Sequence, residues 1–293
     1  MEIVRRVNSM KEVCRQARAN RRTVGFVPTM GALHAGHRSL IRQIKERVDV
    51  VVVSVFVNPT QFESGGDLDG YPRDLARDVD LCVAEDVDYI FAPPPEQIYP
   101  PGAMTFVEVA GLSDILEGAS RPGHFRGVST VVLKLFEIVC PTVAAFGQKD
   151  AQQAVVIRRM VRDLMLDVEI LVLPTVRDED GLAFSSRIVR LSPEERRTAL
   201  AIPRALEAAR QAFKSGRPHA DRVLGAAREV LDAEEGLELD YLELVDGESF
   251  EPVSEVVGER LLLVAARVGR VRLLDNTVLA VVAGGLMESS NSR

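Results

Sequence analysis

Two periodicities of apolar residues alternate along the first part of the chain, up to about residue 175. Short apolar runs rich in β-branched residues occupy positions 23–28, 50–57, 89–92, 142–146 and 168–173. Such runs are typical of strands that are buried on both faces of a sheet. Between them, apolar residues recur at helical spacing over positions 40–48, 75–83, 128–139 and 151–166. Strands alternating with helices predict an α/β fold with a doubly wound parallel sheet.

The pattern changes after Pro174. A charged segment at positions 176–181 predicts a turn and a hinge, and two helices rich in Ala and Arg are expected near 193–214 and 219–233. Ser192 and Pro193 supply a helix cap and a first-turn proline. Strands are expected at 239–245, 260–268 and 271–274, and the polar tail at 288–293 is expected to fray. We therefore predict a first domain at residues 1–175 and a smaller C-terminal α+β domain at residues 176–293.

Composition narrows the range of partners. The 293-residue chain is 46% hydrophobic, carries a net charge of −7 and has a pI of about 5.3. An acidic balance disfavours broad nucleic-acid binding. The longest apolar run, near positions 48–57, is too short to span a bilayer. Cys14, Cys82 and Cys140 lie far apart, without metal or redox spacing. We expect free thiols, a cytoplasmic protein, and neither a nucleic-acid nor a membrane partner.

The segment His34, Ala35, Gly36 and His37 joins an expected strand to an expected helix. Backbone N–H groups and the helix dipole favour an anion there, and doubly wound sheets bind ligands at the carboxyl ends of their strands. The two imidazoles share one helical face, and Gly36 lets a ligand approach the backbone. These features predict a site where a triphosphate is attacked at its α-phosphorus. The alternatives are a zinc site, disfavoured because no HExxH glutamate or nearby cysteine is present, and two capping or surface histidines.

A second strand-to-helix junction spans positions 147–153. Lys149 would place a point charge beside a phosphate, Asp150 would accept from ribose hydroxyls, and Gln153 would bind a polar substrate. An ordinary charged helix start explains this segment equally well when it is taken alone.

Three further loops have polar residues at the ends of expected elements. Ser185, Ser186 and Arg187 follow the expected hinge, and two hydroxyls with a guanidinium suit the phosphates of ATP, although such triplets are common in loops. Positions 58–62 end the most apolar strand, and positions 121–127 lead into a helix. Loops placed in this way often line a substrate pocket.

In this order, the motifs resemble the pantoate–β-alanine ligase (pantothenate synthetase) family. The likeness runs from about residue 20 to about residue 200, and it rests on positions 25–37, 56–62, 71–73, 116–118, 121–128, 146–150, 174–177 and 180–187. The resemblance implies a Rossmann-like nucleotidylyl-transferase domain and a homodimer. It also implies synthesis of pantothenate from pantoate, β-alanine and ATP, with Mg²⁺ and a pantoyl adenylate intermediate.

The resemblance also implies roles for individual residues. The catalytic group would be His34, His37, Lys149, Ser185, Ser186 and Arg187. Other ATP contacts would come from Met30, Gly36, Gly147, Asp150 and Val176, and pantoate contacts from Gln61, Gln153, Pro28, Met30 and His124. Asp78 would be a carboxylate linked to the metal.

Four positions depart from the family pattern: Gly66, Phe184, Ile188 and Arg190. They concern loop closure and adenine packing, and none is a residue assigned to chemistry. The nearest alternative function is a nucleotidylyltransferase that stops after transfer to a phosphate ester. A nucleotide-binding regulator without catalysis is a second alternative, and the complete set of phosphate-binding residues disfavours it. A tRNA-charging role is disfavoured by the acidic pI and the small C-terminal part.

Overall fold

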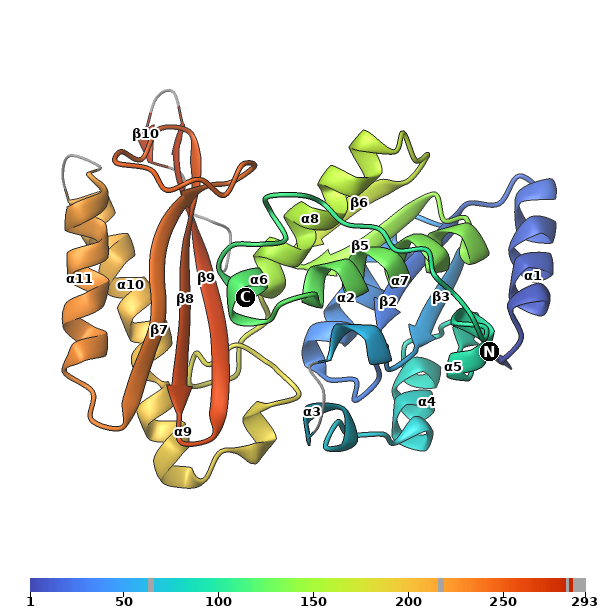
Figure 1. Ribbon diagram of the computed structural model, residues 1–293, viewed down its shortest axis with the longest axis horizontal. Coiled ribbons are helices and arrows are strands. Elements are labelled where there is room, and N and C mark those ends of the chain that lie inside the picture. Colours follow the sequence, from blue (N-terminus) through green and yellow to red (C-terminus); the bar gives the residue numbers. More distant parts are fainter. Residues whose placement is uncertain (63–65, 216–218, 283–284, 287–293) are drawn as a thin grey trace. The chain divides into compact units, whose positions relative to one another are not determined.

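The computed structural model describes the chain except for residues 63–65, 216–218, 283–284 and 287–293, so the whole of the expected frayed tail lies outside the described residues. The chain forms two compact units (Figure 1). Unit 1 consists of Met1–Gly147 and Gln152–Leu173. Unit 2 consists of Gln148–Ala151 and Pro174–Arg293. The short segment Gln148–Ala151 therefore belongs to unit 2, although the strand before it and most of the helix after it belong to unit 1.

Unit 1 is built on a six-stranded parallel sheet in the order β1-β4-β3-β2-β5-β6. The strands are β1 (Glu2–Val4), β2 (Val24–Thr29), β3 (Val50–Val55), β4 (Tyr89–Phe91), β5 (Val143–Gly147) and β6 (Glu169–Leu173). The central strands β2 and β3 are buried along most of their length, because both of their faces carry apolar side chains. The predicted α/β fold with a doubly wound parallel sheet is confirmed.

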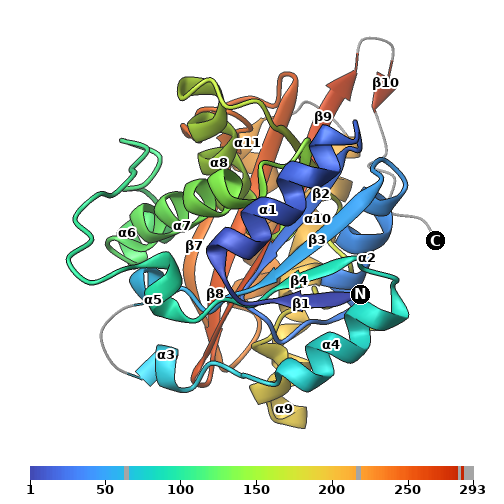
Figure 2. The ribbon, with the colours of Figure 1, turned by 90° about the vertical axis from the view of Figure 1, so that its right-hand side faces the viewer.

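Helices cover both faces of this sheet (Figure 2). The longer helices of unit 1 are α1 (Val7–Ala19), α2 (Ala35–Lys45), α4 (Leu75–Ala84), α7 (His124–Val139) and α8 (Ala151–Asp163). Side chains of α1, α7 and α8 form one apolar cluster with alternate residues of the strands, and side chains of α2 and α4 form another with the intervening residues. The short elements of unit 1 are α3 (Gly66–Asp69), α5 (Pro95–Ile98), α6 (Glu117–Ser120) and η1 (Pro59–Gln61). The short η2 (Gln148–Asp150), which follows β5, belongs to unit 2.

The strand order reverses direction at β2. From β2 the chain continues to β3 and β4 on one side, whereas β5 and β6 lie on the other. Such a switch point opens a crevice at the carboxyl ends of the adjacent strands, where α/β proteins bind ligands. The residues that follow β2 are the loop leading to His34, and Gly147 ends β5. The predicted anion-binding junction thus lies at the topological switch point of the sheet.

Unit 2 packs three helices on one face of an antiparallel sheet (Figure 1). The sheet order is β10-β9-β8-β7, with β7 (Leu237–Asp246), β8 (Glu259–Val268), β9 (Val271–Val282) and β10 (Gly285–Leu286). The helices are α9 (Pro193–Ala199), α10 (Ala201–Lys214) and α11 (Ala220–Asp232), preceded by the short η3 (Ile188–Arg190). Their apolar faces form one core with the sheet. The predicted smaller α+β part is confirmed.

Three details differ from the sequence-based expectation. The helix expected at 193–214 is two helices joined at Leu200, because Pro203 has no N–H to donate to the carbonyl of Ala199. The strand expected at 271–274 continues to Val282 through the buried polar residues Asp275, Asn276 and Thr277. The elements β1 and α1 were not expected at all.

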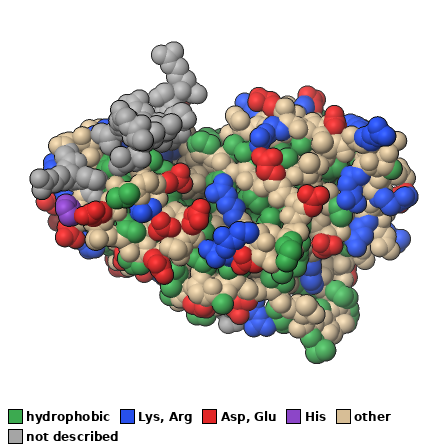
Figure 3. Space-filling view, turned by 90° about the horizontal axis from the view of Figure 1, so that it is seen from above, with side chains coloured by type: hydrophobic (Ala, Val, Ile, Leu, Met, Phe, Trp, Pro, Cys, Tyr) green, Lys and Arg blue, Asp and Glu red, His purple; other side chains and the backbone are tan. Residues whose placement is uncertain are grey.

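Neither the distribution of charge on the surface nor the length and hydropathy of the helices indicates a particular binding partner. On the face seen in Figure 3, acidic and basic side chains are interspersed with apolar ones. Among the described residues, no helix is both long enough and apolar enough to cross a membrane.

Candidate active site

The two histidines after β2 cap the helix α2. His34 is the N-cap residue, and its Nδ1 accepts a hydrogen bond from the N–H of Gly36 at 3.1 Å. The Nδ1 of His37 accepts from the N–H of His34 at 3.3 Å, which completes a capping box. The ring centroids are 4.1 Å apart. Because Nδ1 accepts in both rings, each neutral imidazole carries its proton on Nε2, so both rings can donate to an anion at the helix N-terminus.

A buried carboxylate fixes the loop that leads to these histidines. Asp78, which is 2% exposed, accepts from the N–H of Ala32 at 3.1 Å and from the N–H of Leu33 at 2.7 Å. Gly31 has φ of +83°, and a Cβ there would lie 2.8 Å from the Asp78 carboxylate, so the close approach requires glycine. Burial raises the pKa of Asp78, although its two backbone donors oppose this effect. This geometry suits a residue that orders the loop before His34.

Gln61 stands at the centre of a hydrogen-bonded network. Its Nε2 lies 3.2 Å from the Sδ of Met30, and its Oε1 accepts from the Nδ2 of Asn58 at 2.9 Å. The buried Asn58 also accepts from the hydroxyl of Tyr99 at 2.9 Å. His124 donates from Nδ1 to the backbone carbonyl of Gln61 at 2.9 Å. The network orients the Gln61 amide beside Met30, and it makes His124 a support for the Gln61 backbone.

The loop of Gln61 also lies directly against the helix α7. A Cβ at Gly127 would be 2.5 Å from the backbone oxygen of Thr60, so this contact requires glycine. The Nδ2 of Asn58 donates to the carbonyl of Gly127 at 3.1 Å. The turn-rich segment at 121–127 and the polar segment at 58–62, which are distant in sequence, therefore form one surface.

The two adjacent glutamines of α8 are used differently. Gln152 is buried, donates to the carbonyls of Leu112 and Ile115 at 2.9 and 2.8 Å, and accepts from the N–H of Glu117 at 3.1 Å. It therefore orders the loop before α6. Gln153 is partly buried in the same first turn of α8.

In unit 2, the turn that contains Lys149 is bonded to strand β9. The Nδ2 of Asn276 donates to the carbonyls of Gln148 and Lys149, each at 2.9 Å, and its Oδ1 accepts from the Nε2 of Gln148 at 3.2 Å. The Nζ of Lys149 lies 3.3 Å from the Oδ1 of Asp150. The backbone of this turn is thus fixed by a residue 127 to 128 positions later in the sequence.

The segment expected as a hinge is a hairpin. Arg177 pairs with Ala183 across it, and the N–H of Phe184 donates to the carbonyl of Val176 at 3.0 Å. Arg177 makes a bidentate ion pair with the buried Asp275, at 2.6 and 2.9 Å. The hairpin leads into Ser185, whose Oγ accepts from the N–H of Arg187 at 3.1 Å.

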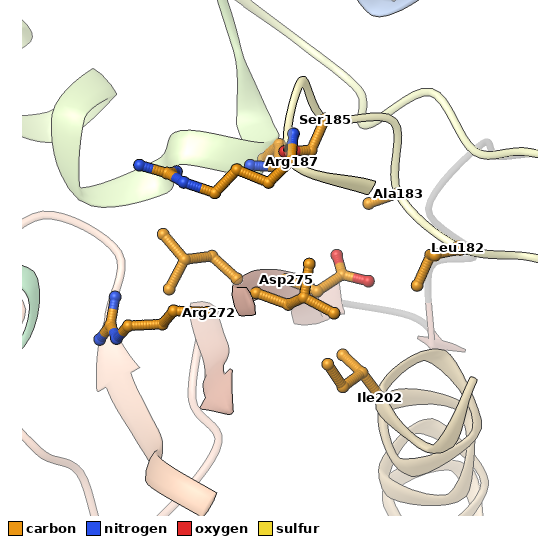
Figure 4. A pocket seen from close by; sticks show the side chains of 10 residues that line it. Leu182, Ala183, Ser185, Arg187, Ile202, Arg272 and Asp275 are labelled. Carbon is orange, nitrogen blue, oxygen red and sulfur yellow. Dashed lines mark hydrogen bonds between the residues drawn. The ribbon is translucent and has the colours of Figure 1, made fainter. Parts of the chain in front are cut away.

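A small pocket, partly open to solvent, lies beside this loop. Lys149, Ser185, Arg187, Arg272 and Asp275 contribute its polar lining. The guanidinium groups of Arg187 and Arg272 lie on one side of the pocket, and the Asp275 carboxylate lies on the other (Figure 4). Because three cationic side chains line it, the pocket suits an anionic ligand.

The predicted site residues are divided between the two units. Unit 1 contains Pro28, Met30, His34, Gly36, His37, Gln61, Asp78, His124, Gly147 and Gln153. Unit 2 contains Lys149, Asp150, Val176, Ser185, Ser186 and Arg187. Within unit 1, hydrogen bonds connect the predicted site residues into two groups. The first group contains His34, Gly36 and His37. The second contains Met30, Gln61 and His124. Within unit 2, Lys149, Ser185 and Arg187 line the same pocket.

Sequence reasoning missed the residues that support these groups. Asn58 and Gln152 stand inside the recognised motifs, but no role was predicted for them. Asp275 and Asn276 lie outside every motif. The available signal was the abrupt break in the apolar pattern after Leu274, where buried polar side chains continue the strand.

Comparison with solved structures places the chain in a class of enzyme. The pantothenate synthetase of Thermus thermophilus matches it with a TM-score of 0.90 and 47% identity, covering 94% of this chain and 99% of that one. A pantoate-beta-alanine ligase of Francisella tularensis, complexed with beta-gamma ATP and beta-alanine, matches with a TM-score of 0.77 and 36% identity, covering 95% and 97%. The fold is that of an α/β ligase.

The sequence comparisons give the family. The model of the family described as pantoate-beta-alanine ligase matches residues 2–278. A pantothenate synthetase of Pseudothermotoga lettingae is 50% identical over 282 residues, which cover 96% of this chain and all of that protein. The chain belongs to the pantoate–β-alanine ligase family, as the motifs predicted, and it is an enzyme that joins pantoate to β-alanine.

Proposed function

We propose that the enzyme works in two half-reactions. The pantoate carboxylate attacks the α-phosphorus of ATP, the bond to the bridging oxygen breaks, and pantoyl adenylate and diphosphate form. The amine of β-alanine then attacks the acyl carbon, AMP leaves and the amine releases a proton, giving pantothenate. The observation that carries this proposal is the pair of imidazoles, 4.1 Å apart, at the N-terminus of α2 and at the switch point of the sheet. Their Nε2–H groups are suited to stabilise charge on phosphoryl oxygens.

The same proposal assigns the other phosphate and nucleotide contacts. Lys149 and the loop of Ser185, Ser186 and Arg187 contact phosphate, which the cationic pocket of unit 2 supports. The remaining nucleotide contacts are Met30, Gly36, Gly147, Asp150 and Val176. No protein nucleophile is required, so catalysis consists of positioning and charge stabilisation.

Pantoate is assigned to the surface around Gln61. Asn58 orients the Gln61 amide, which suits it to bind a hydroxyl or carboxylate of the substrate. Gln153, Pro28 and Met30 complete this set. His124 belongs to it through the Gln61 backbone, which its ring supports.

Mg²⁺ is proposed to enter with ATP, bound to the phosphates. The described residues contain no group of three His, Cys, Asp or Glu side chains that could hold a metal ion. Both carboxylate oxygens of Asp78 accept hydrogen bonds from backbone N–H groups. We assign the phosphate contacts to the residues named above, and to Asp78 the ordering of the loop that leads to them.

Three broader features belong to the same proposal. Residues 1–175 form the domain that binds ATP and pantoate, and residues 176–293 form the domain that carries the phosphate loop. The enzyme is a cytoplasmic homodimer. Three free cysteines, two of them buried, support a reducing compartment. Light scattering after gel filtration measures the dimer directly.

Exchange of labelled diphosphate into ATP tests the proposal. Exchange should require pantoate and should proceed without β-alanine, because the first half-reaction is reversible. Exchange that requires a phosphate ester instead of pantoate would favour a nucleotidylyltransferase. Tight ATP binding without AMP formation, in the presence of both substrates, would favour a regulator.

A further inference from the structure

Asn276 makes an unusual set of contacts for a residue in the middle of a strand. It is 4% exposed, and its neighbours Asp275 and Thr277 are directed to Arg177 and to Arg210 of α10. Because successive side chains of a strand point to opposite faces, Asn276 lies on the other face of β9. There its amide is covered by the turn of Gln148 and Lys149.

The contacts of Asn276 are matched to that turn. Both carbonyls of the turn accept from one amide nitrogen, and the amide oxygen accepts from the Gln148 side chain. An apolar side chain at this position would leave both carbonyls without these donors. The two backbone bonds fix the peptide that precedes and the peptide that follows the Cα of Lys149, and hence the direction in which its side chain leaves the turn.

We propose that Asn276 is a positioning residue for the attack of pantoate on ATP. It keeps the Lys149 ammonium at the pocket that Ser185 and Arg187 also line. The inference rests on the proposed role of Lys149 at the phosphates. A displacement of a catalytic group by about 1 Å can cost about 100-fold in rate. Asn276 therefore acts on the adenylate-forming step through Lys149, without touching ATP itself.

Pantoate-dependent exchange of diphosphate into ATP provides the test, in the full-length enzyme. Asn276→Asp replaces the two N–H donors by a carboxylate oxygen, and Asn276→Ala removes the amide. Each should lower the exchange rate at saturating ATP by about 10- to 100-fold. In a Lys149→Ala background, each should lower the remaining rate by no more than about twofold, because the residue through which Asn276 acts is already gone.

Thr277→Val is the matched control. It removes a buried polar contact, the acceptor for Arg210 Nε at 2.8 Å, one residue away and on the opposite face of β9. Its exchange rate should stay within about twofold of the wild type.

Several outcomes overturn the inference. One such outcome is a folded Asn276 variant whose exchange rate equals that of the wild type. Another is an Asn276 substitution that lowers the exchange rate by the same factor in the Lys149→Ala background as in the wild type. Failure of both variants to fold, judged by circular dichroism, would make Asn276 a structural residue only. Absence of pantoate-dependent exchange in the wild type would instead refute the proposed function, so the two failures are distinguishable.

Discussion

The two strand-to-helix turns that carry predicted site residues are supported in different ways. The turn after β2 is largely complete within itself, since His34 and His37 exchange hydrogen bonds with the backbone of their own helix. The turn after β5 takes its support from Asn276, a residue of β9. Both turns follow a strand of the same sheet, yet Gln148–Ala151 belongs to unit 2.

This difference has a mechanical consequence. A turn that caps its own helix keeps its shape as long as that helix is formed. A turn bonded to another element follows the stability and position of that element. Changes in β9 should therefore reach Lys149 and leave the histidines of α2 unaffected. Four predictions can break or sharpen this comparison.

The largest effect is expected from Asp275→Asn. Asp275 is 2% exposed and neutralises Arg177 in a bidentate pair, so its loss leaves a largely buried guanidinium without a counter-charge. Unfolding of unit 2 should become easier by about 3–5 kcal/mol. Hydrogen exchange measured by mass spectrometry should show lost protection in β9 and in residues 148–151, but not in α2.

The exposed pair of Arg204 and Glu234 gives the control for this prediction. Glu234→Gln should change the stability of unit 2 by less than about 1 kcal/mol. Equal loss of protection in α2 and in β9 after Asp275→Asn would show that the two turns do not differ in their support.

The second effect concerns the histidine turn. His37→Ala removes an imidazole donor and the acceptor for the His34 N–H. Pantoate-dependent exchange should fall by about 10- to 100-fold, equivalent to about 1.4–2.7 kcal/mol. His37→Gln separates the two roles, because glutamine at this position can complete a capping box. His37→Gln should restore thermal stability but leave the exchange rate low. If the exchange rate recovered together with thermal stability, a role for the imidazole would be excluded.

The same difference, between local and distant support, separates the parts of the structure that the sequence could predict from the parts that it could not. The apolar runs at 50–57 and 142–146 predicted β3 and β5, because strands buried on both faces have an unmistakable pattern. The His34 junction was recognisable because a strand end, a glycine and two histidines are adjacent in the chain. Local patterns therefore identified the sheet and the turn whose support is largely local.

Support from distant residues could not be found in this way. Asp275 and Asn276 end the apolar pattern after Leu274, so β9 was expected to stop where it continues. Their partners, Arg177 and the turn of Lys149, lie about 100 residues or more away in sequence. Only the folded chain shows that these polar residues are buried and paired. The sequence likewise indicates Asp78 as a candidate carboxylate, but its bonds to Ala32 and Leu33 depend on how α4 packs.

A third prediction uses that carboxylate. Asp78→Asn leaves one of two backbone N–H groups without an acceptor, which should lower the free energy of unfolding by about 1–3 kcal/mol. Burial raises the pKa of Asp78, so the folded chain binds a proton more tightly than the unfolded chain does. Ionisation of Asp78 therefore reduces stability as the pH rises through and above its ordinary range. The deficit of Asp78→Asn should thus shrink between about pH 4 and pH 7.

Urea unfolding of both proteins at the two pH values measures this deficit. A deficit that grows towards neutral pH would mean that the two backbone donors outweigh burial. Asp78 would then be a carboxylate stabilised in its charged form, and the histidine turn would depend on charge from α4 more than on its own capping box.

The smallest effect on stability is expected at the other turn. The Asp150 side chain is 51% exposed and lies 3.3 Å from Lys149, an arrangement that contributes less than about 1 kcal/mol. Asp150→Asn should leave the unfolding midpoint nearly unchanged, because Asn276 and not Asp150 supports the backbone of the turn. If Asp150 binds the ribose, the KM for ATP should still rise by about 10-fold, with kcat less affected. A stability loss as large as that of Asp78→Asn would contradict the comparison, since it would make the second turn depend on its own side chains as the first one does.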